Sequence, residues 1–162
     1  MSTIRKVFNR YDINPYNGLN ELQSFELERE VYKRLGKSAH FPRLIKSHLS
    51  KRELYLTNVG TSLFSIRQLP KFEPTEQIEA IFNTLNEKGI TYLDMRKEGH
   101  NICFQKGTIY LIDFDIVALD GKAISPEIEE RLSYYNEAET KQFMRNIILN
   151  KMRPIVCQSH LW

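Results

Sequence analysis

Residues 101–112 contain two short β-rich runs whose spacing predicts a β-hairpin. The runs NICF and TIYLI are rich in β-branched and aromatic residues, and Gln105-Lys106-Gly107 between them supplies a turn. A polar residue stands at each end of this hairpin, Asn101 at its start and Asp113 just after it. Because the two ends of a hairpin meet, we expect these two side chains to share one site.

Helical periodicity predicts two helices before the hairpin and a helical region after it. The first spans residues 19–35 and ends at Gly36, and the second spans residues 75–88 and ends at Gly89. Ser125-Pro126-Glu127 opens the last helical region with a capping residue, a proline and an acid in the order that favours a helix start. We expect the aromatic pair Tyr134-Tyr135 to lie in the core of these last helices.

Further β-rich runs surround the first helix, and the chain ends in a segment without a clear pattern. The runs predict strands over residues 3–8, 44–48 and 53–58. The tail from Arg153 is expected to be a loose or docked end. With 162 residues and 41% hydrophobic residues, the sequence fits one compact unit.

Charge and cysteine content exclude several classes of partner and site. The net charge of +3 is too small to indicate nucleic-acid binding by itself. No apolar run approaches the roughly 20 residues that span a bilayer, and the start shows no signal-peptide pattern, so a cytoplasmic protein with no membrane partner is expected. Cys103 and Cys157 lack metal-ligand spacing and are expected to be free thiols.

The order of polar residues from 89 to 115 carries the strongest functional signal. An acid follows a helix, an asparagine precedes the hairpin, and a second acid lies just beyond it. This order resembles the core of the protein-kinase-like superfamily, with Tyr92-Leu93-Asp94, Asn101 and Asp113-Phe114-Asp115 as the matching residues. The resemblance implies ATP as phosphoryl donor, Asp94 as the carboxylate that acts on an acceptor hydroxyl, and Asn101 with Asp113 as Mg²⁺ ligands.

The resemblance also implies a strand lysine paired with a helix glutamate. Lys6 is the strand lysine, and periodicity selects Glu28, which shares its helix face with Val31, Tyr32 and Leu35. A glutamate on the buried face needs a charged or donor partner. Residues 53–60 stand where the superfamily has the last strand and the hinge that receives adenine, so Asn58 and Gly60 are implied to lie at the cofactor.

The sequence departs from the superfamily in three places. Its glycines are far apart, so no glycine-rich loop is expected. The segment from Asp94 to Asn101 is longer than the superfamily's loop by two residues, and either Arg96 or Lys97 could replace the loop lysine. Asp115 stands where the metal motif has glycine.

Each residue alone also has a structural interpretation. Asp94 could be a turn acid, Asn101 a strand-edge cap, Asp113 a hairpin-end acid and Lys6 a surface lysine. The order of all of them together favours an α+β, truncated two-lobed kinase-like fold, in which residues 1–60 form a reduced N-lobe and residues 61–162 a reduced C-lobe.

The sequence is compatible with two functions. The first is a minimal phosphotransferase that moves the ATP γ-phosphate to a protein Ser/Thr-type or small-molecule hydroxyl, and the alternative is a pseudokinase that binds nucleotide or a partner without efficient catalysis. The first third of the chain is basic, which indicates either a solvated face or a docking surface for a protein partner or a second copy of the chain. The basic residues concerned are Lys33, Arg34, Lys37, Arg43, Lys46, Lys51 and Arg52.

Overall fold

The computed structural model describes residues 2–10 and 12–153, which form small antiparallel sheets and helices. The strands are β1 (Thr3–Val7), β2 (Leu44–His48), β3 (Glu53–Thr57), β4 (Thr61–Ser62), β5 (Ile90–Tyr92), β6 (Ile102–Gln105), β7 (Thr108–Leu111) and β8 (Val117–Leu119). The helices are α1 (Glu21–Leu35), α2 (Thr75–Glu87), α3 (Pro126–Ser133) and α4 (Glu137–Met152).

The first sheet has the strand order β1-β3-β2, and helix α1 packs on it. In the β1–β3 pairing Lys6 lies opposite Leu54, and successive side chains of β1 point to opposite faces. Helix α1 begins at a capping box, in which Asn20 and Gln23 each bond the backbone of the other, and ends at Gly36. The apolar stripe of α1 is buried together with Glu28, as the periodicity predicts.

The second half of the chain is organised around two further small sheets. Strands β6 and β7 form the predicted hairpin with Ile102 opposite Leu111, and β4 extends this sheet. Strands β5 and β8 form a two-stranded ladder. Helix α2 packs against α4 and β5.

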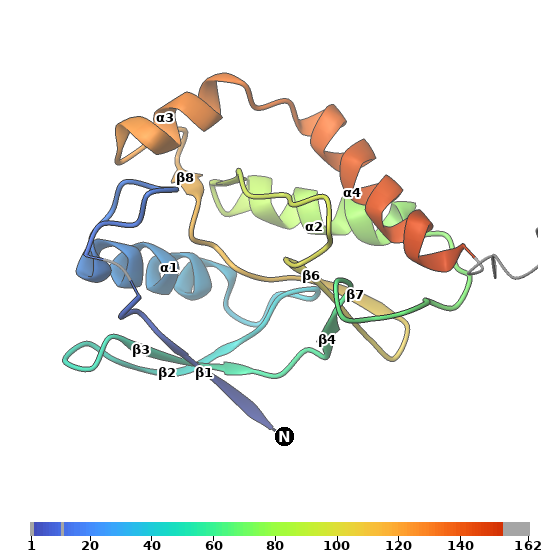
Figure 1. The fold of residues 1–162 in the computed structure, drawn as a ribbon, viewed down its shortest axis with the longest axis horizontal. Coiled ribbons are helices and arrows are strands. Elements are labelled where there is room, and N and C mark those ends of the chain that lie inside the picture. Colours follow the sequence, from blue (N-terminus) through green and yellow to red (C-terminus); the bar gives the residue numbers. More distant parts are fainter. Residues whose placement is uncertain (1, 11, 154–162) are drawn as a thin grey trace, which may run out of the picture.

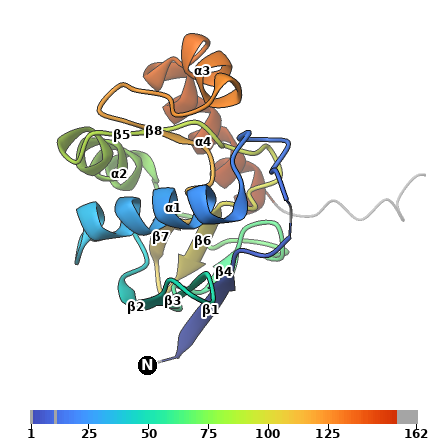
Figure 2. The same ribbon diagram turned by 90° about the vertical axis from the view of Figure 1, so that its left-hand side faces the viewer.

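The elements lie in successive layers (Figures 1 and 2). In Figure 1 the β1-β3-β2 sheet is at the bottom, α1 and α2 lie above it, and α3 with α4 forms the top. Phe114 lies in the core, and its buried ring contacts the rings of Tyr32, Phe41 and Tyr92. Helix α1 and the segment before the hairpin are therefore packed on one shared ring.

The predicted elements are present with shifts of one or two residues at their ends, and Ser125 caps α3 with Pro126 in its first turn. Three short strands were missed: β4, β5 and β8. The prediction that Tyr134-Tyr135 lies in the core was wrong for Tyr134, which is 80% exposed, and Tyr135 is only partly buried. Ile128, Met144 and Ile148 fill the core from α3 and α4.

The structure describes one of the two cysteines and does not describe the tail. Cys103 is a buried free thiol, and burial raises its pKa to about 11. Cys157 and the tail after Arg153 lie outside the described residues. Within residues 2–10 and 12–153, none of the helices has the length and apolar character that crossing a membrane requires.

Candidate active site

Lys6 lies at the centre of a cluster of carboxylates. Its Nζ donates to both oxygens of Glu28, at 2.9 and 2.8 Å, and lies 2.5 Å from Oδ1 of Asp113 and 3.3 Å from Oδ1 of Asp115. The ion pair that the sequence predicts between strand and helix is thus present. Its neighbour Arg5 points the other way and pairs with Glu53.

Burial and the charges within this cluster shift the pKa values of its side chains. Burial lowers the pKa of Lys6, but Glu28, Asp113 and Asp115 together outweigh burial and hold that pKa well above its usual value. Burial raises the pKa of Glu28 well above its usual range and is only partly opposed by the Lys6 ammonium. Burial also raises the pKa of Asp115. At Asp113 burial is outweighed by the Lys6 ammonium, aided by Asp115 and Arg96, and the pKa of the carboxyl is lowered.

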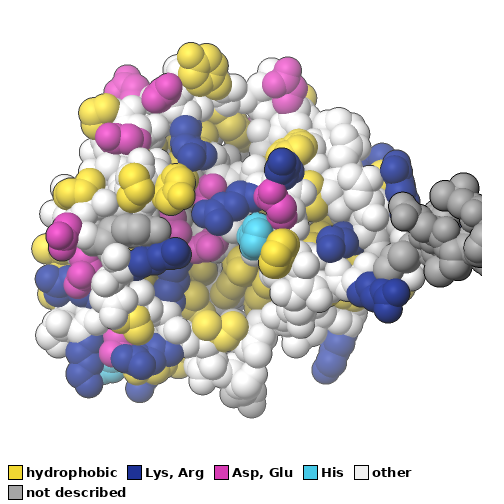
Figure 3. Space-filling view, viewed as in Figure 1, with side chains coloured by type: hydrophobic (Ala, Val, Ile, Leu, Met, Phe, Trp, Pro, Cys, Tyr) yellow, Lys and Arg dark blue, Asp and Glu magenta, His cyan; other side chains and the backbone are white. Residues whose placement is uncertain are grey.

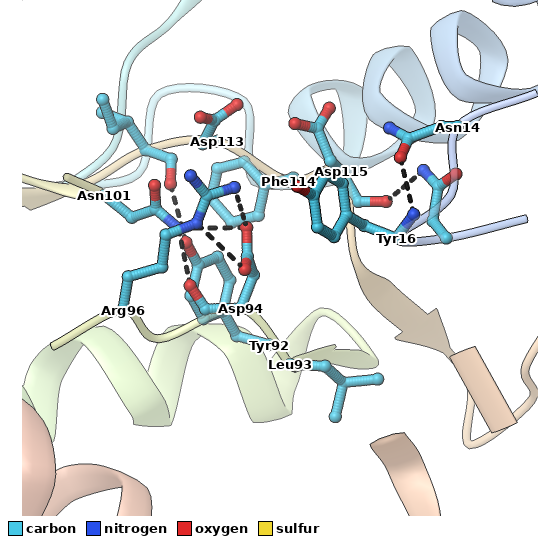
Figure 4. A network of polar contacts seen from close by, with 12 residues as sticks. Asn14, Tyr16, Tyr92, Leu93, Asp94, Arg96, Asn101, Asp113, Phe114 and Asp115 are labelled. Carbon is cyan, nitrogen blue, oxygen red and sulfur yellow. Dashed lines mark hydrogen bonds and ion pairs between the residues drawn. The ribbon is translucent and has the colours of Figure 1, made fainter. Parts of the chain in front are cut away.

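A second polar group forms around Asp94, on the segment that follows β5 (Figure 4). The buried Asn101 amide donates to the Asp94 carbonyl at 2.6 Å and to Asp94 Oδ2 at 3.2 Å. The Arg96 guanidinium donates to both carboxylate oxygens, at 3.3 and 3.2 Å. The Asp94 carboxylate is therefore held in one orientation by two side chains.

The hairpin places Asn101 and Asp113 as the sequence predicts, one at each end of its base. The Ile112 N–H donates to the Asn101 carbonyl at 2.9 Å, which closes the hairpin between the two site residues. Asp113 has a φ of +68°, a left-handed backbone conformation that is uncommon for a residue with a side chain. The backbone then turns so that Phe114 enters the core and its N–H points to Glu28 Oε1 at 3.4 Å.

Not all of the residues proposed from the sequence come to this site. The Lys97 side chain is 80% exposed and its ammonium lies 4.0 Å from Glu98, so Arg96 and not Lys97 is the loop cation that reaches Asp94. Asn58 uses its side chain to accept a bond from the Gly60 N–H at 3.0 Å. Gly60 lines a cavity next to Lys6, as described below, whereas Asn58 does not.

Two cavities meet at Lys6 and Asp113, which line both of them. One measures about 240 Å³ and is walled largely by apolar side chains from β1, β3 and the hairpin, including Ile4, Leu56 and Ile112. The other measures about 680 Å³ and contains Asp94, Arg96 and Asp115. Figure 3 shows Lys, Arg, Asp and Glu side chains gathered around a hollow on this face. An apolar compartment thus opens into a charged one.

Two oxygen-bearing side chains at the base of the hairpin fit a magnesium ion. Oδ1 of Asn101 is buried and has no hydrogen-bond partner among the described residues, although buried amide oxygens normally have one. The Asp113 carboxylate is a second oxygen donor from the other end of the same hairpin. Oxygen donors of this kind are the ligands that Mg²⁺ prefers.

The structure adds two residues to which the sequence assigned no role in the site. Asp115 joins the Lys6 cluster, and Glu28, Asp113 and Asp115 each place one oxygen within 4.8 Å of the others. Arg131 of α3 donates to the Leu93 carbonyl at 3.3 Å and lies 4.0 Å from Asp94. Asp115 was visible in the sequence as a departure from glycine, whereas no sequence pattern marks Arg131.

The basic surface of the first third is partly neutralised. Arg34 bonds Glu30 and Asp120, and Lys46 lies over the Tyr55 ring with its Nζ 4.6 Å from the ring centroid. A docking role for this surface stays a prediction.

Comparison with known proteins shows a similarity in structure and none in sequence. No protein-family model matches the chain, and no curated protein matches it. Among solved structures, the fold is similar to that of the kinase PK-1 of the Cydia pomonella granulovirus, with a TM-score of 0.64 and 15% sequence identity. The fold is kinase-like. The alignment covers 98% of this chain and 63% of the viral kinase, so the chain spans less than two thirds of that protein's length.

Proposed function

We propose that this chain is a minimal kinase-like phosphotransferase that moves the γ-phosphate of ATP to a hydroxyl group. One observation carries the proposal: Lys6, which pairs with Glu28, and Asp94, which bonds Asn101, line the same cavity together with Asp113. In this proposal residues 1–60 act as a reduced N-lobe and residues 61–162 as a reduced C-lobe, and the two make one kinase-like unit.

The nucleotide is proposed to bind across the two cavities. The apolar compartment of about 240 Å³ suits the adenine ring, and Gly60 lies on its wall. The phosphates then extend past Lys6 into the charged compartment. The ammonium of Lys6 is held by a fully buried Glu28, which fixes its position for phosphate binding.

Magnesium would be held by Asn101 Oδ1 and the Asp113 carboxylate. A metal ion held by these two side chains would supply positive charge that offsets the charge of the nucleotide phosphates. In this structure the Lys6 ammonium contacts the Asp113 carboxylate and offsets its charge. The same carboxylate therefore serves the lysine and is proposed to serve the metal.

Asp94 is proposed to orient the acceptor hydroxyl and to accept its proton. Its two oxygens receive three hydrogen bonds, from Arg96 and Asn101, and a carboxylate offers about four acceptor positions. One position is left for a hydroxyl. The acceptor is proposed to be a protein Ser/Thr-type hydroxyl or one on a small molecule.

The alternative is a pseudokinase, and one contact favours it. Arg96 covers both oxygens of the Asp94 carboxylate, the group that an acceptor must approach. If this contact persists with nucleotide bound, the chain binds ATP or a protein partner and transfers phosphate poorly.

Calorimetric titration with ATP, in the presence and absence of Mg²⁺, tests the proposal. We expect ATP to bind more tightly with Mg²⁺, and Asp113→Asn to abolish that gain. Asp120→Asn removes the same charge from a side chain that is 64% exposed and pairs with Arg34, so it is the matched control and should keep the gain. An absence of ATP binding by the parent protein, or an equal Mg²⁺ effect in both variants, would overturn the proposed site.

A further inference from the structure

The loop between β1 and α1 forms one wall of the charged cavity. Asn14 and Tyr16 of this loop line the cavity together with Lys6, Asp113 and Asp115. Figure 4 shows both loop residues on the side of Asp115. The loop thus borders the cavity into which the phosphates are proposed to extend.

This wall has a fixed internal structure. The Asn14 N–H donates to the Leu19 carbonyl and the Gly18 N–H donates to the Asn14 carbonyl, both at 2.8 Å. The Asn14 side-chain oxygen accepts from the Tyr16 N–H at 2.9 Å. Because that oxygen is engaged within the loop, the other end of the Asn14 amide is a pair of N–H donors.

The wall is also fastened to the segment that carries the acidic cluster. Asn17 is fully buried and donates from its amide to the Asp115 carbonyl at 2.8 Å, while Ser125 donates to the Asn17 carbonyl. Gly18 has a φ of +70°, and a Cβ at this position would lie 1.9 Å from Oε2 of Glu127. The loop is therefore packed closely between Asp115 and α3.

Some exposed side chains of the loop line the cavity, and others lie outside it. Tyr16 is 56% exposed and lines the cavity, whereas Ile13 is 58% exposed and does not. Asn20 is exposed outside the cavity, where its side-chain oxygen caps α1 through the Gln23 N–H. The loop thus contains both candidate ligand contacts and matched positions away from them.

We propose that the β1–α1 loop binds the phosphate end of the nucleotide, through the Asn14 amide N–H groups and the Tyr16 hydroxyl. Both groups donate hydrogen bonds, and phosphate oxygens accept them. Hydrogen bonds within residues 14–19 and from Asn17 to Asp115 hold the backbone that carries these donors before a ligand arrives, so that less ordering is needed on binding. This inference rests on the proposed function, since it assigns phosphate contacts within the same cavity.

The test compares variants that differ by single atoms or groups. Asn14→Asp keeps the oxygen that bonds Tyr16 but replaces the donor end with negative charge, and Asn20→Asp makes the same change at the helix cap. We expect Asn14→Asp to weaken Mg·ATP binding about tenfold or more, since a hydrogen bond to a charged group is lost, and Asn20→Asp to leave it unchanged. Tyr16→Phe should weaken binding several-fold, with Ile13→Ala unchanged.

Binding of AMP serves as an internal reference in the same titrations. Since AMP lacks the outer phosphates, its affinity should be the same in Asn14→Asp and in the parent protein. Hydrogen exchange adds a second readout: the amides of residues 13–20 should become more protected with Mg·ATP than with AMP.

The outcomes separate this inference from the proposed function. If the parent protein binds no ATP, both are overturned. If the parent binds Mg·ATP, but Asn14→Asp and Asn20→Asp bind it equally, the loop contact is wrong and the proposed function stands. If Asn14→Asp weakens AMP and ATP alike, the loop acts on the whole site and not on the phosphates, which also overturns the inference.

Discussion

Lys6 and Glu28, which are 22 positions apart in the sequence, are joined by two hydrogen bonds between β1 and α1, at 2.9 and 2.8 Å. Glu28 is fully buried, whereas the Lys6 side chain is 27% exposed toward the cavity. The glutamate therefore depends on the lysine for its charge balance, while the lysine also has Asp113 and Asp115 as neighbours. This asymmetry decides what happens when either partner is removed.

Lys6→Met is expected to destabilise the protein at neutral pH by about 3 kcal/mol, because removing one partner leaves an uncompensated buried charge. Without the ammonium, burial holds the pKa of Glu28 in the folded state above its pKa in the unfolded state. Between these two pKa values the folded state therefore binds a proton that the unfolded state does not bind. The destabilisation should therefore be largest at neutral pH and shrink as the pH falls toward the unfolded carboxyl pKa.

Denaturant unfolding at several pH values checks this expectation, with Arg5→Met as control. Arg5 lies on the opposite face of β1, is 56% exposed, and pairs with Glu53 outside the cluster. Its loss should cost less than that of Lys6. A Lys6→Met deficit that grows on acidification would contradict the assigned charge balance.

Asp94→Ala is expected to retain ATP binding and to lose turnover by about 10²- to 10⁴-fold, the usual worth of a positioned general base. The reason is that Asp94 is proposed to act on the acceptor, while Lys6 and Asp113 meet the nucleotide. Calorimetry for ATP and a phosphate-transfer or ATP-hydrolysis assay measure the two parts separately. Equal turnover by variant and parent would remove Asp94 from the mechanism.

Arg96→Ala and Lys97→Ala form a matched pair of neighbouring cations. Arg96 donates two hydrogen bonds to Asp94, whereas Lys97 is 80% exposed and faces Glu98. In the enzyme proposal Arg96→Ala should lower turnover by up to about 10²-fold through misplacement of Asp94, and Lys97→Ala should have no effect. In the pseudokinase alternative Arg96→Ala should raise turnover, because it uncovers the carboxylate.

Phe114→Ala is expected to destabilise the fold by about 3–5 kcal/mol, the usual cost of removing a buried aromatic ring. Its ring is fully buried against Tyr32, Phe41 and Tyr92, which come from separate parts of the chain. Phe64→Ala is the control, since Phe64 is 54% exposed. Thermal or denaturant unfolding measures both, and similar losses in the two variants would mean that Phe114 is no junction of the core.

Local patterns in the sequence were sufficient to place several residues of the site. Helical spacing identified Glu28 as the inward acid of α1, and the hairpin signal brought Asn101 to Asp113. In both cases residues within a few positions determine which way a side chain points. The resemblance to kinases then connected Lys6 to Glu28, which no local pattern could do.

Other parts of the site depend on contacts between distant residues and have no local signal. Asn17 bonds the backbone of Asp115, 98 positions away, and Arg131 reaches the backbone of Leu93, 38 positions away. The strands β5 and β8 have three residues each, too few for periodicity to reveal, and they exist because they pair with one another. Likewise, the choice between Arg96 and Lys97 needed the course of the loop.

The short pairings β5–β8 and β6–β7 have a consequence for the order in which the protein folds. In the β5–β8 ladder Tyr92 pairs with Val117, and the β6–β7 hairpin lies between these two strands in the sequence. Asp94, Asn101 and Asp113 are therefore brought together by contacts between residues that are near one another in the sequence. Lys6 reaches Asp113 only across 107 positions. Closing a longer loop costs more entropy and is slower, so we expect the Asp94 end to form first during refolding. A chain between these two events would hold Asp113 and Asp115 side by side without their ammonium counter-ion.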